Sequence, residues 1–455
     1  METEVKKPSI KRQYFIALNV YIGQLACGFT MGWTAPVIAI LQDPEQTPLD
    51  KVITDVEASW IVSLPFIGII GGPYISGYLC NVVGRKPCLL FGTSMFIISY
   101  LMLAIGKTLA VVYVARIFVG FGIGVLFVTN LVYLAELAST RVRGMLLTLT
   151  GFYTTQGILI IYVIGPYISY GKINFMILSL CIQQCISIFS SIPESAVYNV
   201  MKGKIEEAKA TLTKLGRQDD IDEIVAQAND KPKPKLAQLT EMYTVKSNRK
   251  AAFIITSLNI LTQFSGMMIV TAFVTVIFDM TGSNMEAHVS TIIVGATQVA
   301  ASLIAPILVD RAGRRILLLV SCAVCSLSLF SLGTYFYLYN NNYAIAEDLK
   351  WLSLVSVMVF CIAYYSGMGI IPCTFIGEMF TDTCRSFGGT ITVTIGWLFG
   401  FALSTTFGYV LPIWGPSVIF WIFSSACAVA FLFTVVFVPE TKGKSFLEIQ
   451  ELLSK

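Results

Sequence analysis

The sequence predicts an all-α membrane protein with twelve transmembrane helices arranged in two halves of six. Three observations carry this prediction: the composition, the recurrence of apolar segments, and a repeat of charged motifs. The chain has 455 residues, of which 55% are hydrophobic and 13% are charged. A soluble domain has about 25% charged residues. Most of this chain must therefore face lipid or other helices.

Apolar segments of about 20 residues recur along the chain, and a hydrocarbon core of about 30 Å needs a helix of that length. Their number predicts twelve spans, and the even count places both termini on one side of the membrane. The predicted spans cover residues 14–41, 57–80, 87–106, 110–135, 146–166, 172–192, 252–279, 288–309, 315–338, 351–379, 387–411 and 415–438.

The distribution of positive charge predicts the orientation. Of the 31 Lys and Arg residues, Arg116 lies inside a span and only four lie in loops opposite the termini, namely Lys51, Lys107, Lys172 and Lys350. Cytoplasmic loops carry an excess of Lys and Arg. Since nearly all the others lie on the side of the termini, we expect both termini to be cytoplasmic.

The only long polar segment, residues 193–250, separates the first six spans from the last six. It contains two amphipathic stretches (KIEEAKATLTKL and DIDEIVAQA) and the breaker DKPKPK. We therefore predict a six-helix half with a short tail over residues 1–192, a cytoplasmic helical linker over 193–250, and a second six-helix half with a short tail over 251–455. The basic N-terminus has no small-residue cleavage site and is read as a tail rather than a signal peptide.

Three motifs of the first half recur in the second half in the same order. GYLCNVVGRKP is followed later by LVDRAGRRI, YLAELASTRVRG by FIGEMFTDTCRS, and IPESAVY by VPETKGK. Parallel repeats of this kind are related by an axis along the membrane normal, as in carriers built from two six-helix halves. The separations are 229 residues from Gly84 to Gly313, 242 from Glu136 to Glu378, and 246 from Pro193 to Pro439.

The repeated charges lie at the cytoplasmic ends of helices, where they can form a latch that holds one gate shut. We expect the arginines after spans two and eight to pair with the repeated glutamates, and Arg143 and Arg385 to reach the opposite half. An exposed pair contributes only about 1 kcal/mol, but a network can bias a two-state equilibrium. The alternative is ordinary snorkelling of interfacial charges. The predicted gate charges are Arg85, Glu136, Arg143, Glu194, Asp310, Arg311, Arg314, Arg315, Glu378, Arg385 and Glu440.

These motifs resemble the sugar porter family of the major facilitator superfamily over nearly the whole chain. The most specific marks are VDRAGRR, VYLAELASTRVRG, QFSG and PETKGKS, and the segments SWIVSLPFIGIIGG and GFTMGWTAP look most like insect facilitated trehalose and glucose transporters. The resemblance implies the major facilitator fold and a passive carrier whose sugar lies between the halves near mid-membrane.

The resemblance also implies a substrate site, in which this chain has lost some polar groups. Met268, Gly151 and Gly396 stand where the family has polar side chains. A buried sugar hydroxyl left without a partner costs roughly 1–3 kcal/mol, so the remaining polar groups matter. Gln263 could instead make an interhelical hydrogen bond, and Trp397 could be a core residue. The predicted substrate-binding residues are Gln263, Gln298, Trp397, Thr262 and Tyr365.

Span ten contains residues that favour bending. Gly367, Gly369 and Pro372 interrupt an otherwise apolar helix, and a missing backbone hydrogen bond is tolerated beside a cavity. We predict a hinge at these three residues.

The sequence argues against several energy sources and cofactors. No GxxxxGK[ST] segment is present, which argues against ATP-driven transport. Proton-coupled relatives place an Asp in span one, where this chain has Gly28, Phe29 and Thr30. Cys322 and Cys325 lie in an apolar helix and are read as packing residues. We predict no cofactor, no metal site, no nucleotide and no nucleic acid partner, and a facilitative uniporter for a sugar such as glucose or trehalose.

Two alternatives to that uniporter stay open at this point. A nontransporting sugar sensor could share the fold, although the short tails argue against one, and the carried solute could be a small polar molecule other than a sugar. An enzyme is the weakest interpretation because the chain has a single histidine, His288, and no acid–base cluster. The family resemblance suggests the plasma membrane.

Overall fold

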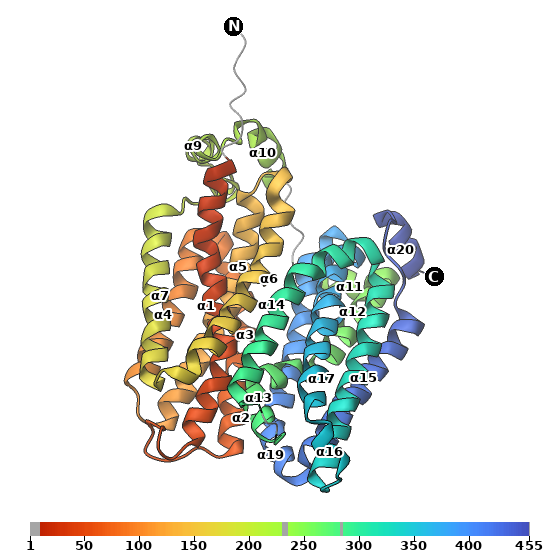
Figure 1. The fold of residues 1–455 in the computed structure, drawn as a ribbon. Helices are drawn as coiled ribbons and strands as arrows, with labels where there is room; N and C mark the ends of the chain where they lie inside the picture. Colours follow the sequence, from red (N-terminus) through yellow and green to blue (C-terminus); the bar gives the residue numbers. More distant parts are fainter. Residues whose placement is uncertain (1–9, 230–234, 283–284, 455) are drawn as a thin grey trace. The chain divides into compact units, whose positions relative to one another are not determined.

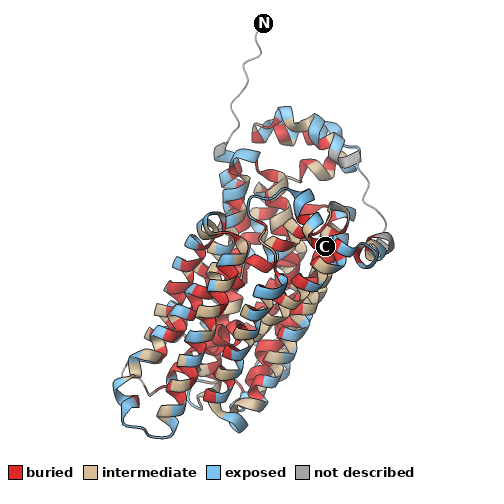
Figure 2. Cartoon of the chain, turned by 90° about the vertical axis from the view of Figure 1, so that its right-hand side faces the viewer, coloured by how far each residue is buried: buried red, intermediate tan, exposed pale blue. Residues whose placement is uncertain are grey.

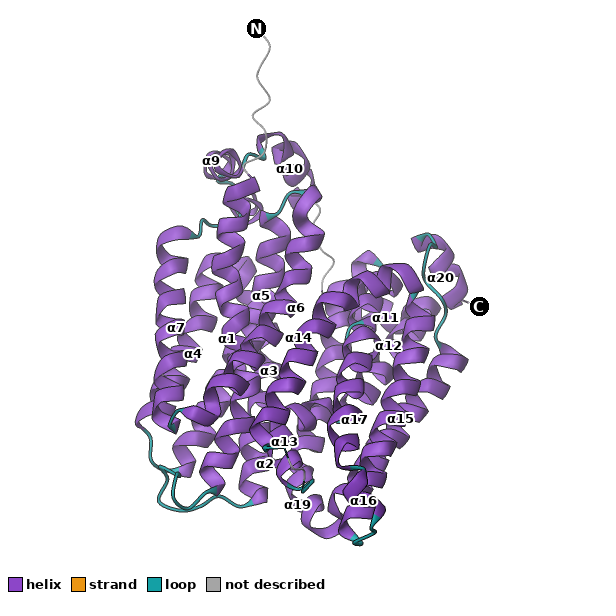
Figure 3. Ribbon diagram, in the orientation of Figure 1, coloured by secondary structure: helices purple, strands orange, loops and turns teal. Residues whose placement is uncertain are grey.

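The computed structural model describes residues 10–229, 235–282 and 285–454, and every regular element among them is helical. Figures 1 and 3 show these helices from the same side, by position in the chain and by secondary structure. The all-α prediction is confirmed for this part of the chain.

The first six spans are formed by seven helices. The second span consists of α2 (Asp55–Ser63) and α3 (Pro65–Val82), which meet at Leu64. Thr54 begins α2 with a capping box, because its hydroxyl accepts from the Glu57 amide at 3.2 Å while the Glu57 carboxylate accepts from the Thr54 amide at 2.9 Å. The other spans are α1 (Ile10–Gln42), α4 (Arg85–Ile105), α5 (Leu109–Leu137), α6 (Thr140–Ile164) and α7 (Tyr170–Ser191).

Spans seven to ten include two interrupted helices. Span seven consists of α12 (Lys246–Phe264) and α13 (Met267–Asp279). Span ten consists of α17 (Lys350–Ala363), a π-helical segment (Tyr364–Met368) and α18 (Ile371–Met379). The two uninterrupted spans between them are α14 (Ala287–Ala312) and α15 (Arg314–Asn340), and the short α16 (Ile345–Asp348) precedes α17.

The last two spans are joined in one helical stretch, α19 (Asp382–Phe437), of 56 residues. At 1.5 Å per residue a straight helix of that length would be about 84 Å long, far more than a membrane needs. The stretch is broken at Gly415, whose φ of 73° and ψ of 166° are not helical and which lies between Pro412 and Pro416. The eleven continuous apolar stretches of the described residues thus correspond to the twelve predicted spans.

The linker and the C-terminal tail form short amphipathic helices. α8 (Ala196–Met201), α9 (Ile205–Leu215) and α10 (Ile221–Asn229) share a small apolar cluster that includes Ala208, Leu212 and Ile224. Figure 2 shows that these short helices carry both buried and exposed residues. The remaining two are α11 (Lys235–Thr244) and α20 (Phe446–Ser454).

Large apolar side chains are exposed along the spans. Phe189 is 74% exposed, Leu327 67% and Val436 70%. A water-soluble protein rarely exposes contiguous apolar surface of this kind. Apolar surface of this kind is suited to contact lipid, which supports a multi-pass membrane protein.

The chain forms two compact units whose limits differ from the predicted sequence halves. The first unit contains Met1–Thr30, Ile67–Gly157 and Gly171–Pro232. Within it α1 and α6 approach closely, since a Cβ on Gly28 would lie 2.0 Å from the Thr154 carbonyl oxygen and one on Gly157 2.4 Å from that of Leu25. Small residues at such crossings let membrane helices pack backbone to backbone.

The second unit contains Met31–Phe66, Ile158–Tyr170 and Lys233–Lys455. Here the start of the second span packs on span eleven. A Cβ on Gly408 would lie 2.3 Å from the Asp55 carbonyl oxygen, and the Trp60 indole donates to the Tyr409 hydroxyl at 3.4 Å. This contact lies at the end of the spans away from the linker. The division into residues 1–192, 193–250 and 251–455 stays a prediction.

Candidate substrate site and charge network

Span seven is broken beside the predicted substrate residues. α12 ends at Phe264, and Gly266 has a left-handed φ of 78° before α13 begins. A Cβ at Gly266 would lie 2.3 Å from the Phe423 ring. Only glycine satisfies both the backbone conformation and this close packing. The break leaves Thr262 and Gln263 in the last turn of α12.

Two amides on α12 face two glycines on α19. A Cβ at Gly400 would lie 2.9 Å from the Gln263 side-chain oxygen, and a Cβ at Gly396 would lie 3.0 Å from the Asn259 Cβ. Both pairs are one helical turn apart, so the amides lie on one face of α12. Among the described residues, the buried Asn259 side-chain nitrogen has no hydrogen-bond partner. The missing side chains at 396 and 400 therefore make room for polar groups.

An aromatic wall adjoins these amides. The rings of Phe66 and Trp397 have centroids 5.6 Å apart at an angle of 54°. The Phe66 ring also lies 2.9 Å from the position of a Gly400 Cβ. Amides beside an aromatic face are the combination that holds a polar ligand with apolar faces in a small-molecule site.

The other predicted substrate residues make contacts within the protein. The Thr262 hydroxyl donates to the Met368 carbonyl at 3.3 Å. Gln298 is fully buried, and its amide contacts the Cys361 sulfur at 3.8 Å while its oxygen has no partner among the described residues. Tyr365 packs edge-on against Tyr364, with centroids 5.6 Å apart. Among the predicted substrate-binding residues, Gln263 therefore lies near Trp397. The side chains of Thr262 and Gln298 instead contact span ten.

Span ten changes from α- to π-helix at the predicted hinge. Ser321 supports the segment, because its hydroxyl donates to the Ala363 carbonyl at 2.7 Å and accepts from the Met368 amide at 2.9 Å. Gly367 packs so closely that a Cβ would lie 2.5 Å from the Ser321 Cβ. Gly369 follows the π-helical segment, and Pro372 lies in the first turn of α18. That these residues act as a hinge stays a prediction.

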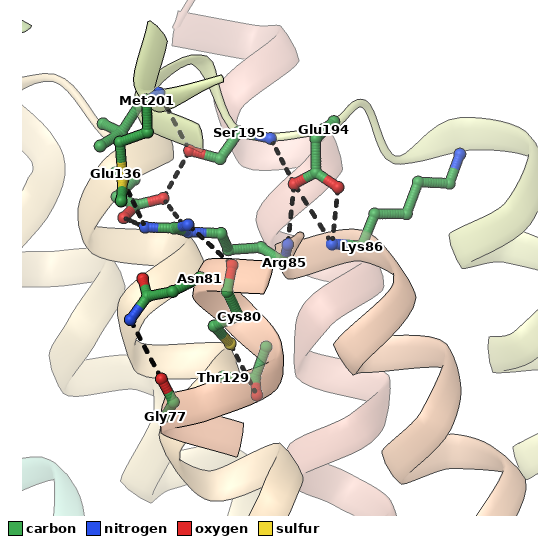
Figure 4. A network of polar contacts seen from close by, with 11 residues as sticks. Gly77, Cys80, Asn81, Arg85, Lys86, Thr129, Glu136, Glu194, Ser195 and Met201 are labelled. Atoms are coloured by element: carbon green, nitrogen blue, oxygen red, sulfur yellow. Dashed lines mark hydrogen bonds and ion pairs between the residues drawn. The ribbon is translucent and has the colours of Figure 1, made fainter. Parts of the chain in front are cut away.

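The N-terminal charge network is centred on Arg85 and is shown in Figure 4. Its guanidinium donates to both carboxylate oxygens of Glu136, at 2.7 and 3.0 Å. Ser195 donates to the same carboxylate. The amides of Arg85 and Lys86 donate to the Glu194 carboxylate at 2.9 and 3.2 Å. A charged pair with this many hydrogen bonds can be buried without an unsatisfied group.

The C-terminal network has the same order of partners. Arg314 donates to Glu378 at 3.0 Å, and Thr441 donates to the second oxygen of that carboxylate at 2.5 Å. The amides of Arg314 and Arg315 donate to Glu440, both at 3.1 Å. The sequence repeat therefore corresponds to a repeat of interactions within each half.

The remaining gate charges bind backbone or lie outside the network. Arg143 donates to the Ala138 carbonyl at 3.4 Å, and the Arg315 guanidinium donates to the Val435 carbonyl at 2.7 Å rather than to a glutamate. Arg311 is exposed, and Arg385 lines a cavity beside Arg314. The side chain of Asp310 lies outside the described residues. Contacts of Arg143 and Arg385 across the halves stay a prediction.

Several residues that make contacts in this region were not singled out by the sequence analysis. Arg217 of the linker donates to the carbonyls of Glu136 and Leu137 at 2.7 and 3.0 Å. Gln450 of α20 donates to the Met379 carbonyl at 2.7 Å. No sequence pattern indicates these two contacts.

Two further network residues could have been predicted from the sequence. Ser195 and Thr441 each follow the repeated Pro-Glu. Asn259 could have been found from its spacing of four residues from Gln263.

Comparison with known proteins identifies related transporters. A family profile described as "Sugar (and other) transporter" matches residues 16–453. The facilitated trehalose transporter Tret1 of Culex quinquefasciatus is 31% identical over 444 residues, covering 96% of this chain and 85% of that protein. The Anopheles gambiae Tret1 is also 31% identical, covering 98% of this chain but only 57% of its own length, so the chain spans little more than half of that relative.

The fold is that of solved major facilitator transporters. The xylose transporter XylE of E. coli in an inward-open conformation gives a TM-score of 0.79 at 23% identity, covering 97% of this chain and 99% of that one. The proton:xylose symporter XylE bound to 6-bromo-6-deoxy-D-glucose gives 0.74 at 24% identity, covering 98% and 99%. At such low sequence identities the structural likeness is evidence for the twelve-helix fold alone.

Proposed function

Since the chain belongs to the sugar (and other) transporter family of the major facilitator superfamily, we propose that it carries a sugar such as glucose or trehalose by facilitated uniport. The observation that carries this proposal is the pairing of the Gln263 and Asn259 amides with the Phe66–Trp397 wall. Amides can satisfy sugar hydroxyls, and the aromatic wall can pack on the apolar face of the ring.

The polar groups buried in the spans favour uniport over proton coupling. Among the described residues the most buried charged side chains are those of Arg85, Arg116 and the linker residue Arg217, and the Glu136 carboxylate at the end of α5 is paired with Arg85. At the place where proton-coupled relatives carry an acid, Thr30 bonds to the Tyr100 hydroxyl at 2.8 Å. A proton carrier needs a group that changes protonation in the working pH range, and neither hydroxyl does so. The name of the mosquito relatives, facilitated trehalose transporter, agrees with passive transport.

We further propose that the repeated networks hold the linker-side ends of each half rigid during alternating access. The residues concerned are Arg85 with Glu136 and Arg314 with Glu378. Both termini and the linker are cytoplasmic on the positive-inside argument, and the plasma membrane is the proposed location. Labelling of terminal epitopes in intact cells tests this orientation, since tags on the cytoplasmic side need permeabilisation.

Counterflow into proteoliposomes tests the transport proposal. The full chain is reconstituted and preloaded with unlabelled glucose, trehalose, fructose or a polyol, and entry of the labelled counterpart is followed. We expect saturable counterflow for glucose or trehalose that a protonophore leaves unchanged. Uptake that collapses with the protonophore would contradict uniport. Saturable binding of a sugar without flux would favour a sensor, and no response to any sugar would favour another polar solute.

A further inference from the structure

Two buried amide side chains of the first unit have no hydrogen-bond partner for either of their polar atoms. Asn130 of α5 is 0% exposed, and Gln184 of α7 is 1% exposed. Among the described residues, these are the two buried amides whose side-chain nitrogen and oxygen are both unpartnered. Buried polar atoms of native proteins are nearly always bonded to protein groups or to ordered water, because an unmade bond is costly. These four atoms therefore point to a ligand.

Gly23 of α1 is the place where the two amides meet. A Cβ at Gly23 would lie 2.3 Å from the Gln184 side-chain nitrogen and 3.4 Å from that of Asn130. At these two distances from one point, the nitrogens are at most 5.7 Å apart. The amides thus approach each other from two helices, without a direct hydrogen bond between them.

A gap of this size fits one bridging oxygen atom. The nitrogen–oxygen distance of an N–H···O hydrogen bond is about 2.9 Å, so a single oxygen can join two nitrogens that are up to about 5.8 Å apart. A polar contact that is too long for a direct bond is often made through a water molecule. The geometry at Gly23 therefore suits a water-mediated contact.

The chemistry of the two side chains selects the ligand. The groups that meet at Gly23 are donors, which attract a lone pair and repel a cation. An anion would carry the high cost of a charge inside a membrane span. Water also donates, so it can serve the amide oxygens as well. Because Asn130 and Gln184 are almost fully buried, a larger ligand has no opening through which to reach them.

The site belongs to the N-terminal half and is not repeated in the other. The offset of 242 that relates Glu136 to Glu378 places Pro372 opposite Asn130, and the offset of 246 places Ala430 opposite Gln184. A six-helix half can thus pack without these two amides. Their presence in the first half therefore calls for a role other than packing.

We propose that Asn130 and Gln184 hold an internal water molecule beside Gly23. This water joins α5 to α7 against α1, and Asn130 lies six residues, or about 9 Å along the helix, before Glu136. A water-mediated bond is nearly as favourable as a direct one. The proposal does not depend on the identity of the transported solute.

Thermal unfolding of the purified full chain tests the proposal with Gln184→Met. Methionine removes the amide while it keeps an unbranched side chain of similar length. If a water is bound, it and Asn130 each lose a partner, and the Tm should fall by a few degrees. If the Gln184 amide has no partner in the wild type, its removal relieves a cost. An unchanged or higher Tm would therefore overturn the proposal.

Gln183→Met is the matched control. Gln183 is the adjacent residue of α7, and its side chain is exposed. The same substitution there should keep the wild-type Tm. An equal loss of Tm in both variants would show a general sensitivity of α7 to methionine and would also overturn the proposal.

A high-resolution structure of the wild-type chain in lipid nanodiscs separates a bridging water from direct pairing of the amides. The expected result is an ordered water at about 2.9 Å from the Asn130 and Gln184 side chains. A direct hydrogen bond between the two amides, with no water beside Gly23, would explain a lower Tm without water and overturn the proposal. This structure also decides the question if Gln184→Met does not fold.

Discussion

Arg85 and Glu136 form a bidentate ion pair, with nitrogen–oxygen distances of 2.7 and 3.0 Å, in which the arginine side chain is only 6% exposed. Removal of one partner from such a pair leaves the other charge buried and costs about 3–5 kcal/mol. We expect Glu136→Gln to lower the Tm of the purified protein by several degrees.

The repeat supplies the control for that measurement. Glu378→Gln removes the equivalent partner from the more exposed Arg314, whose side chain is 19% exposed. The loss should be smaller, because water can solvate the arginine that remains. A larger loss of Tm in Glu378→Gln than in Glu136→Gln would contradict the expectation that the more buried pair contributes more to stability. Double-mutant cycles with Arg85→Gln and Arg314→Gln give the two coupling energies directly.

The amides of α12 are expected to set substrate affinity. Loss of a hydrogen bond to a buried sugar hydroxyl should weaken apparent affinity roughly tenfold. We therefore expect Gln263→Ala and Asn259→Ala to raise the half-saturation concentration of counterflow by that factor. The adjacent Thr262→Val is the control, since its hydroxyl donates to the Met368 carbonyl. Unchanged affinity in Gln263→Ala would assign that amide a structural role.

The close contact at Gly408 should be essential for packing at the end of the spans away from the linker. An alanine Cβ there would lie 2.3 Å from the Asp55 carbonyl oxygen, so the backbones must separate. We expect Gly408→Ala to lower thermal stability and to slow counterflow. Gly151→Ala places a methyl group in open space on another membrane helix and should have little effect. Equal effects of the two substitutions would point to loss of glycine flexibility instead.

Arg217 should anchor the linker to the N-terminal half. Its guanidinium donates to two carbonyls at the end of α5 and pairs with Asp220 at 2.6 Å. We expect Arg217→Ala to increase amide hydrogen exchange in α9 and α10, because the linker would lose its hydrogen bonds to the end of α5. Lys214→Ala, in the last turn of α9, is the control and should leave the exchange unchanged. Protection that persists in Arg217→Ala would mean that the apolar cluster alone holds the linker.

Much of the fold could be predicted from the sequence because membrane spans carry a strong and simple signal. Length and hydropathy define each span, and the same residues form helices in the structure. The repeated motifs led us to expect pairs between the arginines after spans two and eight and the glutamates; Arg85 contacts Glu136 and Arg314 contacts Glu378, whereas the Arg315 guanidinium contacts a backbone carbonyl. The charges are recognisable because so few occur near the spans, and each motif is found twice.

The remaining features of the site and the linker depend on contacts between distant parts of the chain, which no local sequence pattern reveals. Arg217 binds carbonyls about 80 residues earlier in the chain, and any arginine of the linker could have done so. Asn259 lies next to Gly396 only because α12 and α19 pack in one particular register. The direction of Gln298 toward Cys361 follows from helix rotation, which hydropathy does not determine.

The turn at Gly415 also bears on how the chain enters the membrane during synthesis. Apart from Asp382 and Arg385 at its start, α19 has no charged residue, and the exposed Ile413 and Trp414 lie at its turn. Such a connection gives the translocation machinery no charge by which to orient one segment without the other. Spans eleven and twelve are therefore suited to enter the bilayer together as a helical hairpin, oriented by the basic residues that flank it.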